Sequence, residues 1–156
     1  MVDYFEKLDN AKKSLQTADH MLTITHNVVN DPKLLVLVLK NLFYALNNAM
    51  SAVLHYELYY KKIPPFQESF NEVFDLFKVR LFRRYNLNTS YVELIQDVYI
   101  TLKEQKEGPV SFARKGSYVI CSSDYKMKVL SKDSLKNYVE KTKLFIKDVE
   151  NMIKEK

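Results

Sequence analysis

The sequence is poor in the residue types that interrupt or cross-link a chain. It holds two glycines and four prolines, and this scarcity of helix breakers favours long helices. Two glycines also cannot supply a glycine-rich phosphate-binding loop. Cys121 is the only cysteine, so no disulfide can form within the chain, and a reducing compartment is its natural location.

Long hydrophobic runs are also missing. The most apolar stretch, residues 34–39, is six residues long before Lys40 interrupts it, whereas a membrane span needs about 20 residues. The N-terminal segment has no apolar run typical of a signal peptide. We therefore expect a soluble, cytoplasmic protein without a membrane partner. A length of 156 residues, with 47% hydrophobic and 28% charged side chains, predicts one globular domain over residues 1–156.

What the sequence does contain is helical periodicity. Hydrophobic residues recur at spacings of three and four in five segments, at about residues 3–29, 32–62, 67–85, 89–106 and 132–154. The second segment is apolar nearly all round, which predicts the central helix. Asn30, Asp31 and Pro32 should separate the first two helices, with Asp31 as a cap and Pro32 in the first position. Pro64 and Pro65 should end the second helix.

The helical period gives way to a period of two between Ser117 and Leu130, which predicts a short β-hairpin. Alternating side chains would face opposite ways: Tyr125, Met127 and Val129 on one face, Lys126 and Lys128 on the other. The hairpin must lean on the helices, because two strands alone are marginally stable. The predicted fold class is mainly α, an antiparallel bundle of about five helices with a short β-hairpin before the last helix.

Positive charge is concentrated near the C-terminus. The net charge is +5; residues 1–100 are neutral, and residues 101–156 carry 13 basic and 8 acidic side chains. The basic residues around the hairpin, with two tyrosines among them, are Arg114, Lys115, Tyr118, Tyr125, Lys126, Lys128, Lys132 and Lys136. Such cations can neutralise phosphates while the rings stack on bases, so we predict a nucleic-acid-binding site. The alternative is an edge hairpin protected from aggregation by its lysines.

Arg80 and Arg84, with Arg83 between them, extend this candidate site to the end of the third helix. Arginine matches phosphate oxygens well, which favours a part in binding. The alternative is that the arginines only complement the negative end of the helix dipole.

Three polar residues of the second helix, Asn41, Asn48 and His55, lie seven positions apart and form one line. They predict either the floor of a ligand cleft or a structural network with the first helix or a dimer seam. The spacing of the histidines, His20 and His26 included, does not suit a metal, and we expect exposed or hydrogen-bonded imidazoles. We predict no metal, no cofactor and no catalytic residue, with Cys121 as a core side chain.

The segment KNLFYALNNAMSAVLHYELYY, followed by a short third helix and a late amphipathic helix, resembles the HEPN superfamily of small helical bundles. Those domains open with two long antiparallel helices, and the second carries a Tyr-Ala-x-x-Ala stripe. In this chain the corresponding residues are Tyr44, Ala45, Ala49 and Ala52.

The resemblance also carries functional expectations. Many HEPN proteins are metal-independent RNases or antitoxin-partnered toxins, act as dimers and carry an R-x4-H motif. The closest string here runs from Arg80 to Tyr85, with tyrosine in place of histidine. A phenol, whose unperturbed pKa is about 10, is a poor acid or base near neutrality. The resemblance therefore implies a non-catalytic member that binds nucleotides, RNA or a protein partner.

Three functions follow from these observations. The first is a HEPN-like module that binds nucleic acid or a nucleotide through the basic hairpin. The second is a homo-oligomeric structural or protein-interaction domain, with a homodimer expected. The third is a divergent metal-independent RNase that uses Arg80, Arg114 or His55.

Overall fold

The computed structural model describes residues 3–29 and 31–154. In chain order its elements are α1 (Tyr4–His20), the π-helical turn η1 (Met21–Thr25), α2 (His26–Val29), α3 (Leu34–Tyr59), α4 (Phe70–Leu76), the π-helical turn η2 (Phe77–Leu81), α5 (Ser90–Glu107), β1 (Val110–Arg114), β2 (Ser117–Cys121), β3 (Met127–Leu130) and α6 (Lys132–Lys154). α1, η1 and α2 form one continuous helix, as do α4 and η2. The predicted mainly α fold is therefore confirmed.

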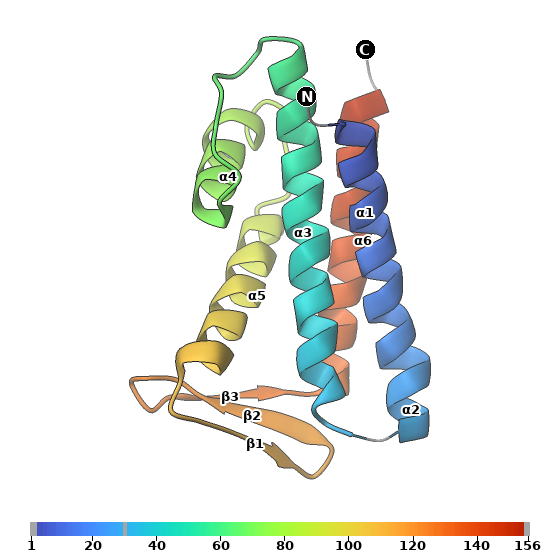
Figure 1. Cartoon of the computed structure of the whole chain (residues 1–156), viewed down its shortest axis with the longest axis vertical. Helices are drawn as coiled ribbons and strands as arrows, with labels where there is room; N and C mark the ends of the chain where they lie inside the picture. The colour runs from blue at the N-terminus through green and yellow to red at the C-terminus, as the bar shows by residue number, and fades with distance from the viewer. Residues whose placement is uncertain (1–2, 30, 155–156) are drawn as a thin grey trace.

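The helices form an antiparallel bundle that a small sheet closes at one end (Figure 1). α3 is central and contacts α1, α4, α5 and α6. α1 and α5 run towards the sheet, whereas α3 and α6 run away from it (Figure 1). α4 and η2 lie beside the half of α3 that is distant from the sheet (Figure 1).

Small side chains are buried on both α1 and α3, which pack against each other. Ala11 and Ala18 on α1, and Ala45, Ala49 and Ala52 on α3, are fully buried. Alanines let two helix backbones approach closely, so the stripe that the sequence suggested serves as a packing surface. By length and composition α3 could also cross a membrane, but 56% of its most apolar window is buried inside the bundle.

The first two helices are capped close to the predicted positions. Asp3 accepts hydrogen bonds from the amides of Phe5 and Glu6, at 3.0 and 3.3 Å. The Asp31 side chain accepts from the amide of Lys33 at 3.0 Å, which confirms it as a cap, although α3 begins at Leu34 and not at Pro32. The Asn30 part of this prediction falls outside the described residues.

The prolines do not end α3. The helix ends at Tyr59, because Lys61 adopts a left-handed conformation (φ 59°) and the amide of Lys62 bonds back to the carbonyl of Glu57 at 2.9 Å. This is the hydrogen-bond pattern of a Schellman motif, with lysine where glycine is usual. The residue type gave no signal for it, and the predicted end at residue 62 was therefore three residues too late.

The third helix is shorter than predicted. It begins at Phe70, because the Ser69 hydroxyl accepts from the amide of Glu72 at 3.3 Å, and the Glu72 carboxylate accepts from the amide of Gln67 at 3.0 Å. The Ser69-x-x-Glu72 spacing is that of a capping box, a signal that the periodicity alone overlooked. The face predicted to be buried is confirmed: Val73, Phe74, Phe77 and Leu81 are buried and Phe70 packs against them.

The last two helices agree closely with their predicted bounds. Asn88 caps α5, since its side-chain oxygen accepts from the amide of Ser90 at 2.9 Å. Ser131 caps α6 by accepting from the amide of Ser134 at 3.1 Å. The inward residues predicted for α6 are buried or half-buried: Leu135, Tyr138, Thr142, Phe145, Val149 and Met152.

β2 and β3 form the predicted antiparallel hairpin, but a third strand joins them. β1 pairs antiparallel with β2, in the sheet order β1-β2-β3. Lys115 and Gly116 make the two-residue connection between β1 and β2, with positive φ at both (44° and 80°). Such a turn matches the twist of the paired strands. The sequence prediction missed β1 because lysine is not a usual residue at the first of these positions.

Candidate functional site

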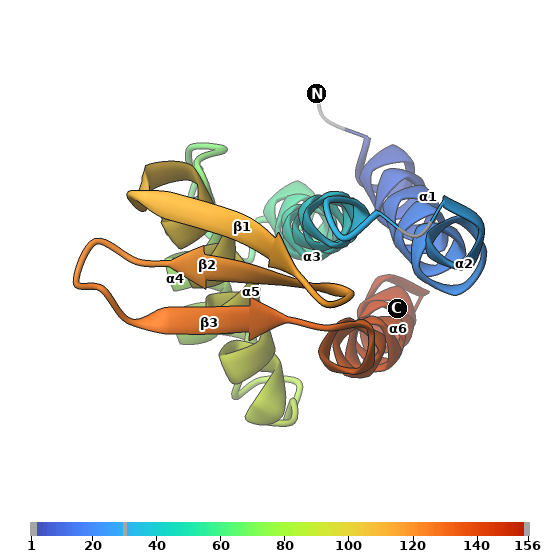
Figure 2. The ribbon, with the colours of Figure 1, turned by 90° about the horizontal axis from the view of Figure 1, so that it is seen from below.

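The sheet turns one face towards the helices and the other away from them. Figure 2 looks onto the second face, and none of the described helices crosses in front of it. The register places six apolar side chains on this outer sheet face: Val110, Phe112, Val119, Cys121, Met127 and Val129. We use "outer sheet face" for these six residues.

Much of the outer sheet face is exposed. Met127 is 62% exposed, Val110 and Val129 are each 52% exposed, and Phe112 is 41% exposed. Val119 is paired with both Phe112 and Val129 in the sheet, and it is 1% exposed although it does not belong to the main core. Its neighbours on the sheet therefore cover it. A contiguous apolar patch of this kind on a surface is typical of an interaction site.

The inner face is the one that carries Lys128. Ile120 and Leu130 are buried in the main core, and Tyr118 packs against it. Lys128 is on the same face, and its ammonium group donates to the hydroxyl of the buried Thr101 on α5, at 2.9 Å. The alternation of Met127 and Val129 against Lys128 is as predicted. However, the side that carries Met127 and Val129 faces solvent and the lysine faces the bundle, because Lys128 shares its face with Ile120 and Leu130, which are buried in the main core; Thr101 provides an acceptor for the lysine there.

The exposed cations lie at the two ends of the sheet. Arg114 and Lys115 belong to the β1–β2 turn, and Tyr125 and Lys126 to the β2–β3 turn at the opposite end of β2. Lys126 lies 3.9 Å from the carboxylate of Asp124. A hydrogen bond from the Ser122 hydroxyl, with the charge of Lys126, keeps the pKa of Asp124 below its ordinary value.

Other residues of the predicted nucleic-acid site lie elsewhere. Lys132, at the start of α6, donates to the side-chain oxygen of Asn27 at 2.8 Å. Arg80 is exposed on η2, in the half of the bundle away from the sheet (Figure 1). Arg84 bonds to the carboxylate of Glu57, which is fully buried, and so holds the fold together. The structure therefore does not gather Arg80 and Arg84 with the cations of the sheet turns, whereas Lys132 follows the end of β3 that is paired next to the β1–β2 turn.

The polar line of α3 forms hydrogen bonds but does not line any of the described cavities. Asn41 donates to the carbonyl of Leu37 at 3.0 Å and contacts the sulfur of Met21 on the first helix at 3.8 Å. His55 bonds to the Glu68 carboxylate, and its ring lies 4.9 Å from that of Phe66. Asn48 is half-buried. These contacts match the structural-network alternative better than a cleft.

Two expectations about single residues need correction. His26 is buried, and its Nδ1 has no hydrogen-bond partner among the described residues, whereas the sequence suggested exposed or bonded histidines. Cys121 is not a core side chain, since it is half-buried and belongs to the outer sheet face. Within residues 3–29 and 31–154, no group of three or more His, Cys, Asp or Glu side chains is arranged to hold a metal ion.

Sequence reasoning missed Val110 and Phe112 as candidate functional residues. The signals for a further strand were present in the sequence, because residues 110–114 precede Lys115 and Gly116, and the next strand begins directly afterwards.

Comparison with known proteins adds no further assignment. No protein-family model matches the chain, and no curated protein was found to match it.

Proposed function

We propose that this protein is a binding module whose protein partner docks on the outer sheet face. The observation that carries the proposal is the exposure of four large apolar side chains, Val110, Phe112, Met127 and Val129, on one uncovered face of the sheet. Exposed apolar surface has a free-energy cost in water, and burial recovers about 25 cal/mol per Å². A partner that covers these side chains would gain this contribution.

The chemistry of the partner follows from the charges around the face. Arg114 and Lys115 at one end, and Lys126 at the other, are exposed, and Asp124 is the acidic residue of these turns. An apolar protein segment with Asp or Glu beside it would complement the centre of the face and its Arg114–Lys115 end, while Lys126 at the other end already lies 3.9 Å from the Asp124 carboxylate. A second copy of the chain, the expected homodimer, would bring a sheet end of the same positive charge and so complements the face less well.

A site-specific cross-link tests this proposal. The photo-reactive residue p-benzoylphenylalanine replaces Val129 in the full chain, which is expressed in the cells that naturally produce it. Irradiation then cross-links position 129 to any polypeptide that is bound to the outer sheet face. Replacing Val79, which is 74% exposed on η2 and distant from the sheet, provides the matched control. We expect an adduct with one polypeptide from position 129 and none from position 79.

Binding by the purified partner completes the test. The affinity of the trapped polypeptide should fall at least about ten-fold for the chain with Met127→Lys and Val129→Lys, because a lysine in an apolar interface is desolvated without a counter-charge. The Val79→Lys variant should bind like the original protein. Equal adducts from both positions, or adducts only with a second copy, would overturn the proposal.

Nucleic acid is a second candidate, favoured by the cations at both turns together with the exposed rings of Phe112 and Tyr125. Fluorescence anisotropy with a labelled single-stranded RNA tests it. Affinity should fall steeply as salt rises, and further with Arg114→Glu and Lys126→Glu. No binding at low salt would exclude this candidate.

The relationship to HEPN bundles is also a proposal. Two long antiparallel helices, α1 and α3, open the fold and pack through alanines, which supports it. Tyr85, which stands at the histidine position of the family motif, donates to buried Glu57 at 3.2 Å. A tyrosine at this position, held by a buried carboxylate, favours the non-catalytic alternative.

A further inference from the structure

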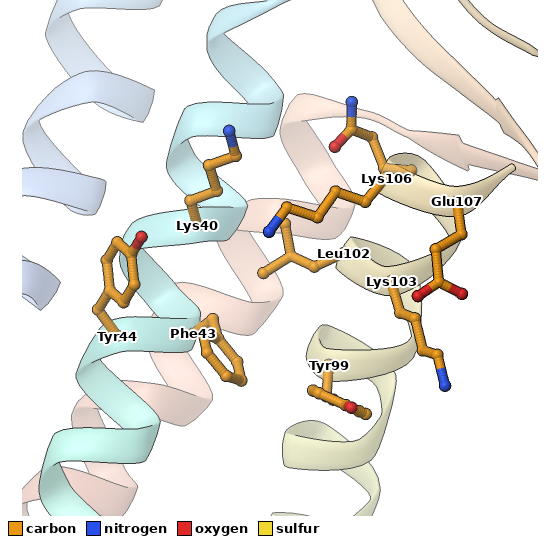
Figure 3. A pocket seen from close by; sticks show the side chains of 9 residues that line it. Lys40, Phe43, Tyr44, Tyr99, Leu102, Lys103, Lys106 and Glu107 are labelled. Atoms are coloured by element: carbon orange, nitrogen blue, oxygen red, sulfur yellow. The ribbon is translucent and has the colours of Figure 1, made fainter. Parts of the chain in front are cut away.

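A groove between α3 and α5 lies just above the sheet and is separate from the outer sheet face. Its volume is about 380 Å³, which is within the range of small-molecule sites. Figure 3 shows Phe43 on α3 and Tyr99 on α5 directed into the space between the two helices, with Leu102 beside them. Phe43 and Tyr99, which are 56 residues apart in the sequence, thus contribute to one concave, aromatic surface.

The rings of the groove hold one another in place. Tyr99 stacks on Phe70, with ring centroids 4.2 Å apart and an angle of 15° between the planes. Phe43 lies 5.3 Å from Phe70 and 5.9 Å from Tyr99, measured between centroids. Since each ring is fixed by its neighbours, the aromatic surface is formed before any ligand arrives. A planar ring can therefore bind here at a small entropic cost.

Two cations reach the same space. Lys106 extends from α5 towards α3, and Lys40 stands on α3 above the rings (Figure 3). Lys103 and Glu107 also line the groove, at its outer side, with their charged ends directed away from α3 (Figure 3). In the part of the chain that the structure describes, no carboxylate lies within 4 Å of the ammonium groups of Lys40 and Lys106. An anion could therefore bind both without breaking an ion pair.

We infer that this groove binds a small molecule that carries both a planar ring and an anionic group, such as a phosphate or a carboxylate. The ring would lie against Phe43 and Tyr99, and the anion would accept from Lys40 and Lys106. A free inorganic anion would leave the aromatic surface unused. A neutral ring would leave the two ammonium groups without a counter-charge. The site needs both parts of the ligand.

Titration calorimetry with the full chain and three probes tests this inference. The probes are 1-naphthyl phosphate, which has both parts, 1-naphthol, which has only the ring, and inorganic phosphate, which has only the charge. We expect 1-naphthyl phosphate to bind at least about ten-fold more tightly than either of the others. Equal affinity for 1-naphthol would show an unspecific apolar patch, and equal affinity for inorganic phosphate would show charge alone; both would overturn the inference.

The lysines provide a matched set of variants. Lys106→Gln and Lys40→Gln should each weaken 1-naphthyl phosphate about five- to ten-fold, because each removes a charge-assisted hydrogen bond. Lys136→Gln removes the same charge from an exposed lysine on α6 that does not line the groove, so it should change the affinity less than two-fold. An equal effect of Lys136→Gln and Lys106→Gln would refute the assigned geometry.

Two natural sources of this chemistry can be separated in the same experiment. Adenosine 5′-monophosphate represents ring phosphates, and indole-3-propionate represents ring carboxylates. Whichever probe binds more tightly, and loses that affinity in Lys106→Gln, identifies the source. If neither of these two probes nor 1-naphthyl phosphate bound, the inference would be overturned. The proposal that a protein partner binds the outer sheet face would not be affected by that result.

Discussion

Arg84 shows how a single residue can be mistaken for part of a binding site when its partner, here Glu57, is unknown. The carboxylate of Glu57 is fully buried and is bonded to Arg84 and to the hydroxyl of Tyr85. Arg84 therefore compensates a buried charge that would otherwise be costly. Nothing local to the Arg83-Arg84 sequence distinguishes this arginine from its exposed neighbour.

Replacing Arg84 by alanine should destabilise the protein by about 3 kcal/mol, because the Glu57 carboxylate would stay buried without its counter-charge. Urea denaturation measures the free energy of unfolding. Arg83→Ala, in the exposed neighbour, should change it by less than about 0.5 kcal/mol. The double variant Glu57→Gln with Arg84→Ala should lose less than Arg84→Ala alone. Equal free energies of unfolding for Arg84→Ala and Arg83→Ala would contradict this structural role of Arg84.

Glu68 links the loop before α4 to both long helices. It accepts from the Ser51 hydroxyl at 3.0 Å, bonds to His55, and lies 3.7 Å from the ammonium group of Lys7. Burial raises the pKa of Glu68, but the hydrogen bonds from His55 and Ser51 and the charge of Lys7 lower it by more. The net pKa is below the ordinary value of 4.5.

A lowered pKa in the folded state means that ionised Glu68 stabilises the fold above pH 4.5, and that this stabilisation disappears as the pH falls through the lowered pKa. Glu68→Gln should therefore be less stable than the original protein at pH 7, by under about 1 kcal/mol since the side chain is partly exposed. The difference should shrink as the pH falls below 4.5. Urea denaturation at pH 7 and pH 3.5 measures it, and a constant difference would rule out this linkage.

At the scale of elements, Gly108 decides how the sheet is attached to the bundle. It ends α5, and a Cβ atom at this position would lie 2.2 Å from the carbonyl oxygen of Cys121 and 2.5 Å from that of Glu104. Both contacts are with backbone atoms, which cannot rotate away. The close approach of helix end and strand β2 therefore requires glycine.

Gly108→Ala should destabilise the protein by about 2 kcal/mol or more, because the strand must move away from the helix end. Gly116→Ala is the matched control for a glycine in a turn: a Cβ there meets nothing within 4 Å, and only the positive φ of 80° is unfavourable. It should cost about 1 kcal/mol. Thermal unfolding of both variants checks the order, and a larger effect at Gly116 would refute the argument.

At the scale of the whole molecule, stability and partner binding should be separable. Met127→Lys with Val129→Lys should change the free energy of unfolding by less than about 1 kcal/mol, because both side chains are already more than half exposed. Val119→Lys should destabilise strongly, since Val119 is buried between its strand neighbours. Thermal unfolding compares the two. If the exposed pair were as costly as Val119, the outer sheet face would be part of the folded core and not a docking surface.

The sequence by itself determined the helices, because a period of 3.6 and a capping residue are local signals. α6 agrees with prediction over its whole length, with Ser131 as its cap and Phe145 and Val149 in the core. The β2–β3 hairpin was readable from its period of two. The end of α3, which depends on the left-handed conformation of Lys61, could not be predicted from the sequence, because that conformation is uncommon for lysine.

Only the tertiary structure decided what each face meets. A period of two separates Met127 from Lys128, but it does not say which of them turns inward; the packing of Ile120 and Leu130 into the core of the helices decides this, and Thr101 of α5 then accepts a hydrogen bond from Lys128. Likewise, Lys40 and Lys106 are ordinary surface lysines in the sequence, and they share a groove because α3 and α5 pack side by side. Periodicity predicts which residues share a face of one helix or strand, whereas a binding site depends on the distances between residues of different elements.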